Sequence, residues 1–196
     1  MNVFVIRHGE TAWSRSGRHT GTTDIPLTDE GHRSAEAMRR ALSREDFALV
    51  LVSGALRARQ TCELAGLGGK AFVDNDLMEW SYGAYEGLTP AEIEKISPGW
   101  LVFRDGCPQG ETPEQVGARA DRVIVRVRAA LGDVALFAHG HLLRVLAARW
   151  IGLPPCEGQR FLLDTGSLGL LGDYRGVPAI RAWNAPAGGW PNASSG

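Results

Sequence analysis

Short apolar runs alternate along this chain with longer segments whose apolar residues recur at helical spacing. A short apolar run that contains β-branched side chains and ends at Gly, Ser or a polar loop is typical of a buried strand. On this basis we expect strands at residues 3–6, 48–52, 71–73, 134–138, 168–171 and 178–183. The direction of the last two strands is left open.

The segments between these strands carry helix signals. Ala35, Met38 and Leu42 are spaced for one helix face after Thr28, which is a candidate N-cap. Further helices are expected at residues 56–64, 90–96, 116–131 and 142–151. Strands that alternate with helices predict an α/β fold, here a three-layer sandwich with a mostly parallel central sheet and helices on both faces.

Residues 80–112 differ from the rest of the chain because they hold many Gly, Pro and aromatic residues around one short helical stretch. We expect a long, partly irregular insertion there, of the kind that often forms an active-site wall. The length of 196 residues suits one domain, expected at residues 1–184. Residues 185–196, which are rich in Gly, Pro, Ala and Ser, are expected to form a mobile tail.

Composition excludes several classes of partner. The chain has 21 basic and 22 acidic residues and no long basic stretch, which argues against nucleic-acid binding. Its apolar start is interrupted at Arg7, so it is too short for a signal peptide or a membrane span. Three cysteines without CxxC spacing predict free thiols and a cytoplasmic location.

Two of the expected strands end in the same way. One delivers Arg7, His8 and a glycine, and another delivers His139 and Gly140. Ligands of parallel α/β sheets bind beyond the carboxyl ends of the strands, so the two imidazoles would face each other if these strands are neighbours. Arg57 follows a third strand, and Glu79 follows a fourth.

These residue types suit phosphoryl transfer. Arginine presents a planar fork that matches phosphate oxygens. Nearby arginines disfavour protonation of His8, which keeps its imidazole nucleophilic, and His139 can stabilise the equatorial oxygens in the transition state. Glu79 can protonate the leaving oxygen and later activate water. Glu86 is the alternative acid if the loop folds differently.

A metal site is the weaker alternative. His8, His139 and Glu79 could in principle ligate a cation, but HExxH and CxxC patterns are absent from the sequence and the adjacent arginines would repel a positive ion. We therefore expect neither a metal nor a cofactor. Among the remaining cations, Arg59, Arg144 and Arg160 are expected at the surface or behind the site. His19 is either an ordinary loop residue or a residue that touches the substrate.

The same residues resemble a known family. Arg7-His8-Gly9-Glu10-Thr11 is similar to the RHGxT signature of the histidine phosphatase superfamily, the phosphoglycerate-mutase-like proteins, and the resemblance runs from residue 2 to about residue 184. Further blocks follow in the family's order, at Ser53 with residues 56–61, at residues 79–87, and at residues 139–141.

The resemblance implies a role for each matching residue. His8 would become phosphorylated, Arg7, Arg57 and His139 would surround the phosphate, and Glu79 would be the proton donor. By the same matching, the pocket would be lined by Thr11, Ser14, Thr20, Gly21, Gly140 and His141. Ser14 departs from the asparagine common at its position, which puts that contact in doubt.

The expected function is hydrolysis of small phosphate monoesters through a phosphohistidine on His8. Residues 17–21, 79–87 and 104–112 look like the branch of bacterial acid phosphatases and sugar bisphosphatases. The alternatives are a phosphoglycerate mutase and a catalytically silent phosphate-binding protein. The partner is a small phosphorylated substrate, whose identity the sequence leaves open together with the role of Arg104. A homodimer also stays open, since members of the family often form dimers.

Overall fold

The computed structural model describes residues 1–43 and 45–187, and within them six strands form one sheet in the order β3-β2-β4-β1-β5-β6. Strand β1 pairs in parallel with β4, β4 with β2, and β2 with β3, whereas β5 is antiparallel to β1 and to β6. The strands are β1 (Val3–Arg7), β2 (Phe47–Val52), β3 (Ala71–Val73), β4 (Asp133–Ala138), β5 (Ser167–Tyr174) and β6 (Val177–Pro186).

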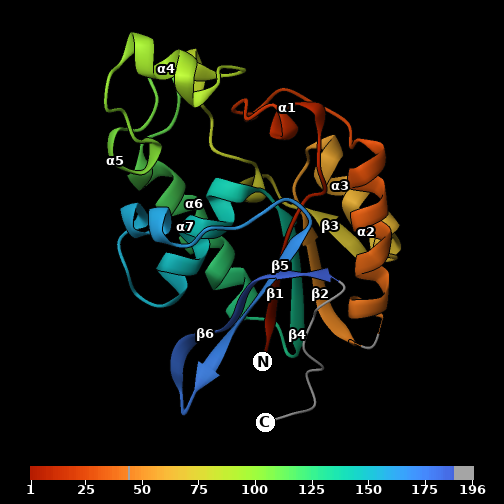
Figure 1. The fold of residues 1–196 in the computed structure, drawn as a ribbon. Helices are drawn as coiled ribbons and strands as arrows, with labels where there is room; N and C mark the ends of the chain where they lie inside the picture. The colour runs from red at the N-terminus through yellow and green to blue at the C-terminus, as the bar shows by residue number, and fades with distance from the viewer. Residues whose placement is uncertain (44, 188–196) are drawn as a thin grey trace.

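Helices cover both faces of the sheet. In Figure 1, α2 (Asp29–Leu42) and α3 (Leu56–Leu64) lie on one side, and α6 (Pro113–Arg128) and α7 (Gly140–Trp150) lie on the other. The alternation of buried side chains along β1 explains this: Phe4 and Ile6 pack with α2 and α3, whereas Val3 and Val5 pack with α6 and α7. The predicted three-layer α/β fold is therefore confirmed.

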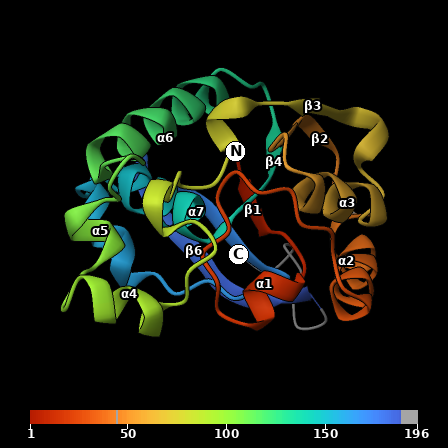
Figure 2. The same cartoon turned by 90° about the horizontal axis from the view of Figure 1, so that it is seen from above.

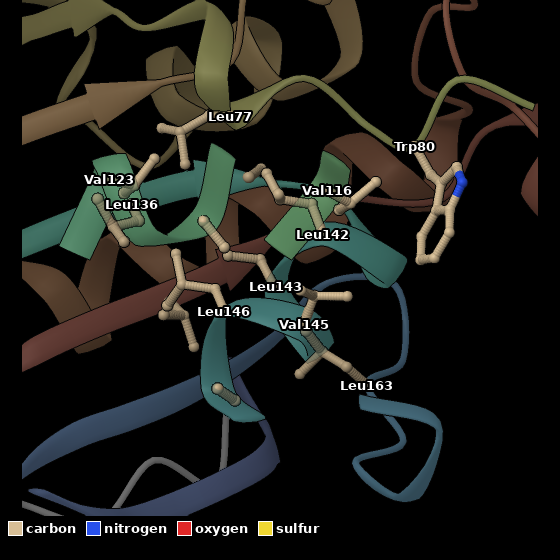
Figure 3. Close-up of a cluster of buried hydrophobic side chains, with 14 of the residues drawn as sticks. Leu77, Trp80, Val116, Val123, Leu136, Leu142, Leu143, Val145, Leu146 and Leu163 are labelled. Carbon is tan, nitrogen blue, oxygen red and sulfur yellow. The ribbon is translucent and has the colours of Figure 1, made fainter. Parts of the chain in front are cut away.

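The larger hydrophobic core lies between the sheet and the α6–α7 pair. Figure 3 shows Leu142, Leu143 and Leu146 of α7 beside Val116 and Val123 of α6, with Leu136 of β4 facing them. All of these side chains are buried. This packing fixes the first turn of α7, and with it the residues that follow β4, against the sheet.

Shorter elements gather beyond the carboxyl ends of the parallel strands. They include α1 (Ala12–Arg15), α4 (Pro90–Ile96) and α5 (Val102–Asp105), which lie at the top of Figure 1. Figure 2 views this end and shows α1, α4 and α5 along one side of it. Short 3-10 segments complete the connections, at η1 (Gly68–Lys70), η2 (Asn75–Leu77), η3 (Gly83–Tyr85) and η4 (Pro155–Arg160). The expected insertion at residues 80–112 contains η3, α4 and α5, all of which are short.

Some element boundaries differ from the expectation. Helix α6 starts at Pro113, earlier than predicted, because Thr112 caps it and forms a capping box with Gln115. Strand β6 continues through Pro186, so the first residues of the expected tail are strand residues, and residues 188–196 lie outside the described part. Across residues 1–43 and 45–187, no helix combines the length and apolar character needed to cross a membrane.

Candidate active site

His8 and His139 meet at one edge of the sheet. His8 follows β1 and His139 follows β4, and these strands are parallel neighbours, so both histidines leave the sheet side by side. Their ring centroids are 5.2 Å apart. Sequence reasoning predicted this juxtaposition on the condition that the two strands pair, and they do.

The hydrogen bonding of His8 defines its tautomer. Its Nδ1 lies 2.7 Å from the Gly9 carbonyl oxygen, which can only accept, so Nδ1 carries the proton and Nε2 keeps its lone pair. Burial, followed by the charges of Arg57 and Arg7, holds the pKa of His8 well below its usual range. The ring is therefore neutral at neutral pH, with a nucleophilic nitrogen available.

Arg7 supplies an unsatisfied buried donor beside His8. Its Nη1 donates to the Leu163 carbonyl oxygen, but its Nε is buried and finds no partner among the described residues. The guanidinium lies against Gly140, where an added Cβ would come within 3.0 Å of the Arg7 Cζ. Only a residue without a side chain leaves room for this arginine, and the free N–H suits an anion oxygen.

Arg57 and His139 lie behind His8 rather than on a cavity wall. The Arg57 guanidinium is fully buried. Its Nε donates to Nδ1 of His139 at 3.2 Å, and its Nη2 donates to the carbonyl oxygens of Thr20 and Gly21. Since His139 Nδ1 accepts, its Nε2 donates to Ser53 Oγ at 2.7 Å. Both ring nitrogens of His139 are thus bonded to protein groups, and Arg57 acts on His8 through its charge.

Glu79 is held at the start of α7. Its Oε1 accepts from the backbone N–H groups of Trp80 and Leu142 at 2.9 and 3.0 Å, and its Oε2 accepts from that of His141 at 3.1 Å. The two oxygens therefore differ, because Oε2 accepts a single hydrogen bond from the protein. A proton carried on Oε2 would leave the other bonds of the carboxyl group intact.

Glu86, the alternative acid, is engaged elsewhere. Its carboxylate accepts from the backbone N–H groups of Gly21 at 2.9 Å and Thr23 at 3.0 Å. It thereby holds the loop before α2 in place, and it does not line the cavity that His8 lines. Glu79, not Glu86, lines this cavity together with His8.

A cavity of about 230 Å³ lies over His8. Among the pocket residues that the resemblance implied, Ser14, Thr20, Gly140 and His141 line it. Thr11 does not, because its side chain is buried and caps α1 by accepting from the Ser14 N–H. Gly21 does not either, because its backbone groups are bonded to Glu86 and Arg57.

Several further lining residues were not predicted from the sequence to line the pocket. They are Gly17, Arg18, Tyr82, Pro90 and Arg144. Arg144 was expected at the surface or behind the site, and this expectation was wrong because Arg144 lines the cavity. It follows Gly140 by four residues on α7, and residues at that spacing share a helix face. His19 also lines the cavity, with Nδ1 donating to the Leu88 carbonyl at 3.0 Å. Arg104, by contrast, is exposed and paired with Asp105.

No group of three or more His, Cys, Asp or Glu side chains within the described residues could hold a metal ion. The positive charge around His8 comes from Arg7 and Arg57.

Comparison with known proteins agrees with the geometry. Residues 3–186 match the family model described as histidine phosphatase superfamily (branch 1). The chain belongs to this superfamily. The membership together with relatives named as phosphatases supports phosphatase activity, the hydrolysis of phosphate esters, and the phosphohistidine mechanism is general for the family.

Individual relatives support this membership. The chain is 42% identical over 179 residues to an acid phosphatase of Mycobacterium tuberculosis, covering 89% of this chain and 88% of that one. It is 38% identical over 182 residues to sedoheptulose 1,7-bisphosphatase of Saccharomyces cerevisiae, covering 76% and 67% of the two chains. The solved structure of an open reading frame from M. tuberculosis superposes with a TM-score of 0.90 at 39% identity, covering 95% and 98%.

Proposed function

We propose that the protein hydrolyses small phosphate monoesters in two transfers, from the ester to His8 Nε2 and from His8 to water. The observation that carries the proposal is the state of His8. Its Nδ1–H is bound to the Gly9 carbonyl, its pKa is held well below the usual range by burial and by two arginines, and it faces a cavity. A neutral imidazole with a free Nε2 is a competent nucleophile toward phosphorus.

The first transfer uses Arg7 and Glu79. The Nε–H of Arg7 that lacks a described partner would bind a phosphoryl oxygen, which orients phosphorus toward His8. As the bond from His8 Nε2 to phosphorus forms and the ester P–O bond breaks, a proton moves from Glu79 Oε2 to the leaving oxygen. The product alcohol then leaves and the phosphoryl group stays on His8.

The second transfer reverses the role of Glu79. Its carboxylate accepts a proton from a water molecule whose oxygen attacks phosphorus, the bond between phosphorus and His8 breaks, and inorganic phosphate is released. His139 would bond a phosphoryl oxygen only by exchanging its hydrogen bond to Ser53 for one to phosphate. In the arrangement described here, it supports Arg57 and packs against His8.

The acid-phosphatase type of activity is supported by similarity to the M. tuberculosis acid phosphatase. We propose that the reaction needs no added metal, because arginines supply the positive charge around the phosphoryl group. EDTA should leave turnover unchanged, whereas loss of activity restored by one divalent ion would contradict this. The free thiols of Cys62, Cys107 and Cys156 support a cytoplasmic location, which is also a proposal.

Turnover of the His8→Ala variant tests the function. We expect wild-type protein to release phosphate from p-nitrophenyl phosphate, and the folded variant to retain under about a hundredth of that rate because it has no nucleophile. A higher residual rate would contradict the assignment. Incubation with 3-phosphoglycerate and its bisphosphate primer separates hydrolysis from mutase chemistry, since a mutase forms 2-phosphoglycerate faster than free phosphate. A silent binding protein would do neither.

A further inference from the structure

His19 has no part in the reaction proposed above, although it lines the same cavity as His8. Its Nδ1 lies 3.0 Å from the Leu88 carbonyl oxygen. Because a carbonyl oxygen can only accept a hydrogen bond, Nδ1 carries the proton of the neutral ring and Nε2 keeps a lone pair. The side chain of His19 therefore presents a hydrogen-bond acceptor at Nε2.

The Nε2 atom of His19 is available to a ligand. Its ring makes one hydrogen bond to the described residues, through Nδ1, which leaves Nε2 without a partner among them. Unlike the Nε of Arg7, this Nε2 is not one of the buried polar atoms that lack a partner, so it is not sealed from solvent. Since His19 lines the cavity, a molecule that enters the cavity can reach this atom.

The ring of His19 is held in place by its surroundings. The backbone N–H of His19 also donates to the Leu88 carbonyl, at 3.0 Å, and the His19 carbonyl accepts from the Gly87 N–H at 2.9 Å. The ring packs edge-on against Tyr82 and Trp100, with centroid distances of 4.7 and 5.6 Å. The acceptor is thus oriented before a ligand binds, which lowers the entropy cost of using it.

The charge of the cavity restricts which donor can meet this acceptor. Burial is the largest cause that lowers the pKa of His19, so the ring is neutral at neutral pH. Three arginines, Arg7, Arg18 and Arg144, outnumber the one acidic residue, Glu79, among the described lining residues. An ammonium group would be repelled by this excess of positive charge, and an ionised phosphate or carboxylate has no hydrogen to donate. A hydroxyl group is the neutral donor that remains.

His141 is the other imidazole in this part of the cavity, with its ring centroid 6.0 Å from that of His19. Its Nδ1 lies 2.5 Å from the Tyr82 hydroxyl oxygen. Because a hydroxyl group can donate or accept, this contact permits either tautomer of His141. The Leu88 carbonyl permits only one tautomer of the neutral His19 ring, so the acceptor is assigned to His19.

We propose that His19 Nε2 accepts a hydrogen bond from a hydroxyl group on the alcohol part of the substrate, so that the protein favours phosphate esters whose alcohol carries a further hydroxyl group. This inference rests on the proposed function. His19 is then a specificity residue. It holds the alcohol end of the ester, whereas Arg7 orients the phosphoryl end.

Paired esters that differ in their hydroxyl groups test the proposal in the full-length protein. Glycerol 3-phosphate is compared with n-propyl phosphate, and ribitol 5-phosphate with n-pentyl phosphate, so that hydroxyl groups at several distances from phosphorus are sampled. The measured quantity is the ratio of kcat/KM within each pair. Comparing this ratio between wild type and a His19 variant separates the hydrogen bond from differences in the size of the esters. We expect His19→Phe to lower the ratio about fivefold in at least one pair, which is the effect of one net hydrogen bond.

The chosen variants separate hydrogen bonding from packing. His19→Phe keeps an aromatic ring against Tyr82 and Trp100, and the Leu88 carbonyl still accepts from the backbone N–H of residue 19. His19→Gln supplies an amide oxygen as an acceptor and should retain part of the wild-type ratio. His32→Phe makes the same substitution on α2, outside the cavity, and should leave the ratio unchanged.

Two results would overturn the proposal. One is a ratio that His19→Phe leaves unchanged in both pairs, including an equal loss on both members, since it would indicate that His19 only supports the cavity wall. The other concerns the kind of donor and uses 2-aminoethyl phosphate beside 2-hydroxyethyl phosphate. A wild-type preference for the amine that disappears in His19→Phe would assign the acceptor to an ammonium group instead of a hydroxyl group.

Absence of any hydrolysis, p-nitrophenyl phosphate included, would instead refute the proposed function. The hydroxyl contact is then measured by binding, with calorimetric Kd values of ribitol 5-phosphate and n-pentyl phosphate for wild type and His19→Phe. The variant should weaken binding of ribitol 5-phosphate about fivefold relative to n-pentyl phosphate. A Kd ratio that is the same in both proteins would overturn the inference independently of turnover.

Discussion

At the scale of single residues, the chemistry of the site depends on which of the two ring nitrogens of each histidine carries the proton. The Gly9 carbonyl assigns the proton of His8 to Nδ1, and the Arg57 guanidinium assigns the proton of His139 to Nε2. Buried arginines disfavour a second proton on either ring, because burial and then the charge of Arg57 lower the pKa of both histidines. The neighbours of His8 therefore keep its Nε2 free for attack on phosphorus.

The contribution of Glu79 to the hydrolysis rate should depend on the leaving group of the ester. We predict that Glu79→Gln slows hydrolysis of alkyl phosphates about a hundredfold or more, because an alkoxide needs a proton as it leaves. The same variant should slow p-nitrophenyl phosphate much less, because nitrophenolate leaves without one. Steady-state kinetics on both esters measure the contrast.

The control for that experiment is Glu86→Gln, which alters a carboxylate bonded to the loop amides of Gly21 and Thr23. It should not discriminate between the two esters. An equal loss on both esters in Glu79→Gln would indicate that Glu79 only positions α7, and no loss at all would transfer the acid role to another group.

At the scale of elements, α6 holds the Glu79 segment through Arg119. The Arg119 Nη1 donates to the Met78 carbonyl at 2.9 Å, and its Nε donates to Glu111 Oε1 at 2.7 Å. Glu111 Oε2 in turn accepts from the Ser81 N–H at 2.9 Å. The backbone is thus fixed on both sides of Glu79 by one mostly buried ion pair. We infer that Arg119 is a positioning residue for the acid.

We predict that Arg119→Lys reduces kcat on alkyl phosphates by about tenfold or more, since lysine cannot bridge a carbonyl and both Glu111 oxygens. The loss on p-nitrophenyl phosphate should be smaller, which a general loss of folded protein would not produce. Arg122→Lys is the matched control, because Arg122 lies on the same helix and bonds only the Asp76 side chain. An Arg119→Lys variant that loses both activities in proportion would refute the positioning role.

Part of the site could be predicted from the sequence, and part of it could not. The end of a buried strand is visible in the sequence as the point where an apolar run stops. The positions of Arg7, His8 and His139 could therefore be predicted, because two apolar runs end in the same pattern. The surroundings of Arg57 could not, because its partners are carbonyls of an irregular loop at Thr20 and Gly21 whose course no periodicity encodes. Arg144 could have been found, since its spacing from Gly140 on a helix that leaves the sheet edge is visible in the sequence.

At the scale of the whole molecule, the buried histidines connect stability with pH. Burial is the largest cause that holds the pKa of His8, His139 and His141 well below the usual range. Above pH 6.5 these rings are neutral in both the folded and the unfolded state. As the pH falls below 6.5, the unfolded chain binds protons that the folded protein does not, and the free energy of unfolding decreases.

We predict that the free energy of unfolding falls between pH 6.5 and pH 5, by up to about 1.4 kcal/mol per pH unit for each such histidine. Urea denaturation at several pH values measures the slope. His141→Gln should reduce that slope by one such contribution, since it removes one of the imidazoles whose pKa is lowered. A free energy of unfolding that stays constant or rises as the pH is lowered through this window would show that the imidazoles protonate without penalty in the folded protein.

The central claim, that His8 carries the phosphoryl group, is tested most directly by trapping the intermediate. Protein mixed with a phosphorus-labelled ester and quenched within a turnover should carry label in an acid-labile, base-stable bond. Peptide mapping should then place the label on His8, with no label in His8→Ala. Label in an acid-stable ester of Ser or Thr, or label that persists in His8→Ala, would contradict the account.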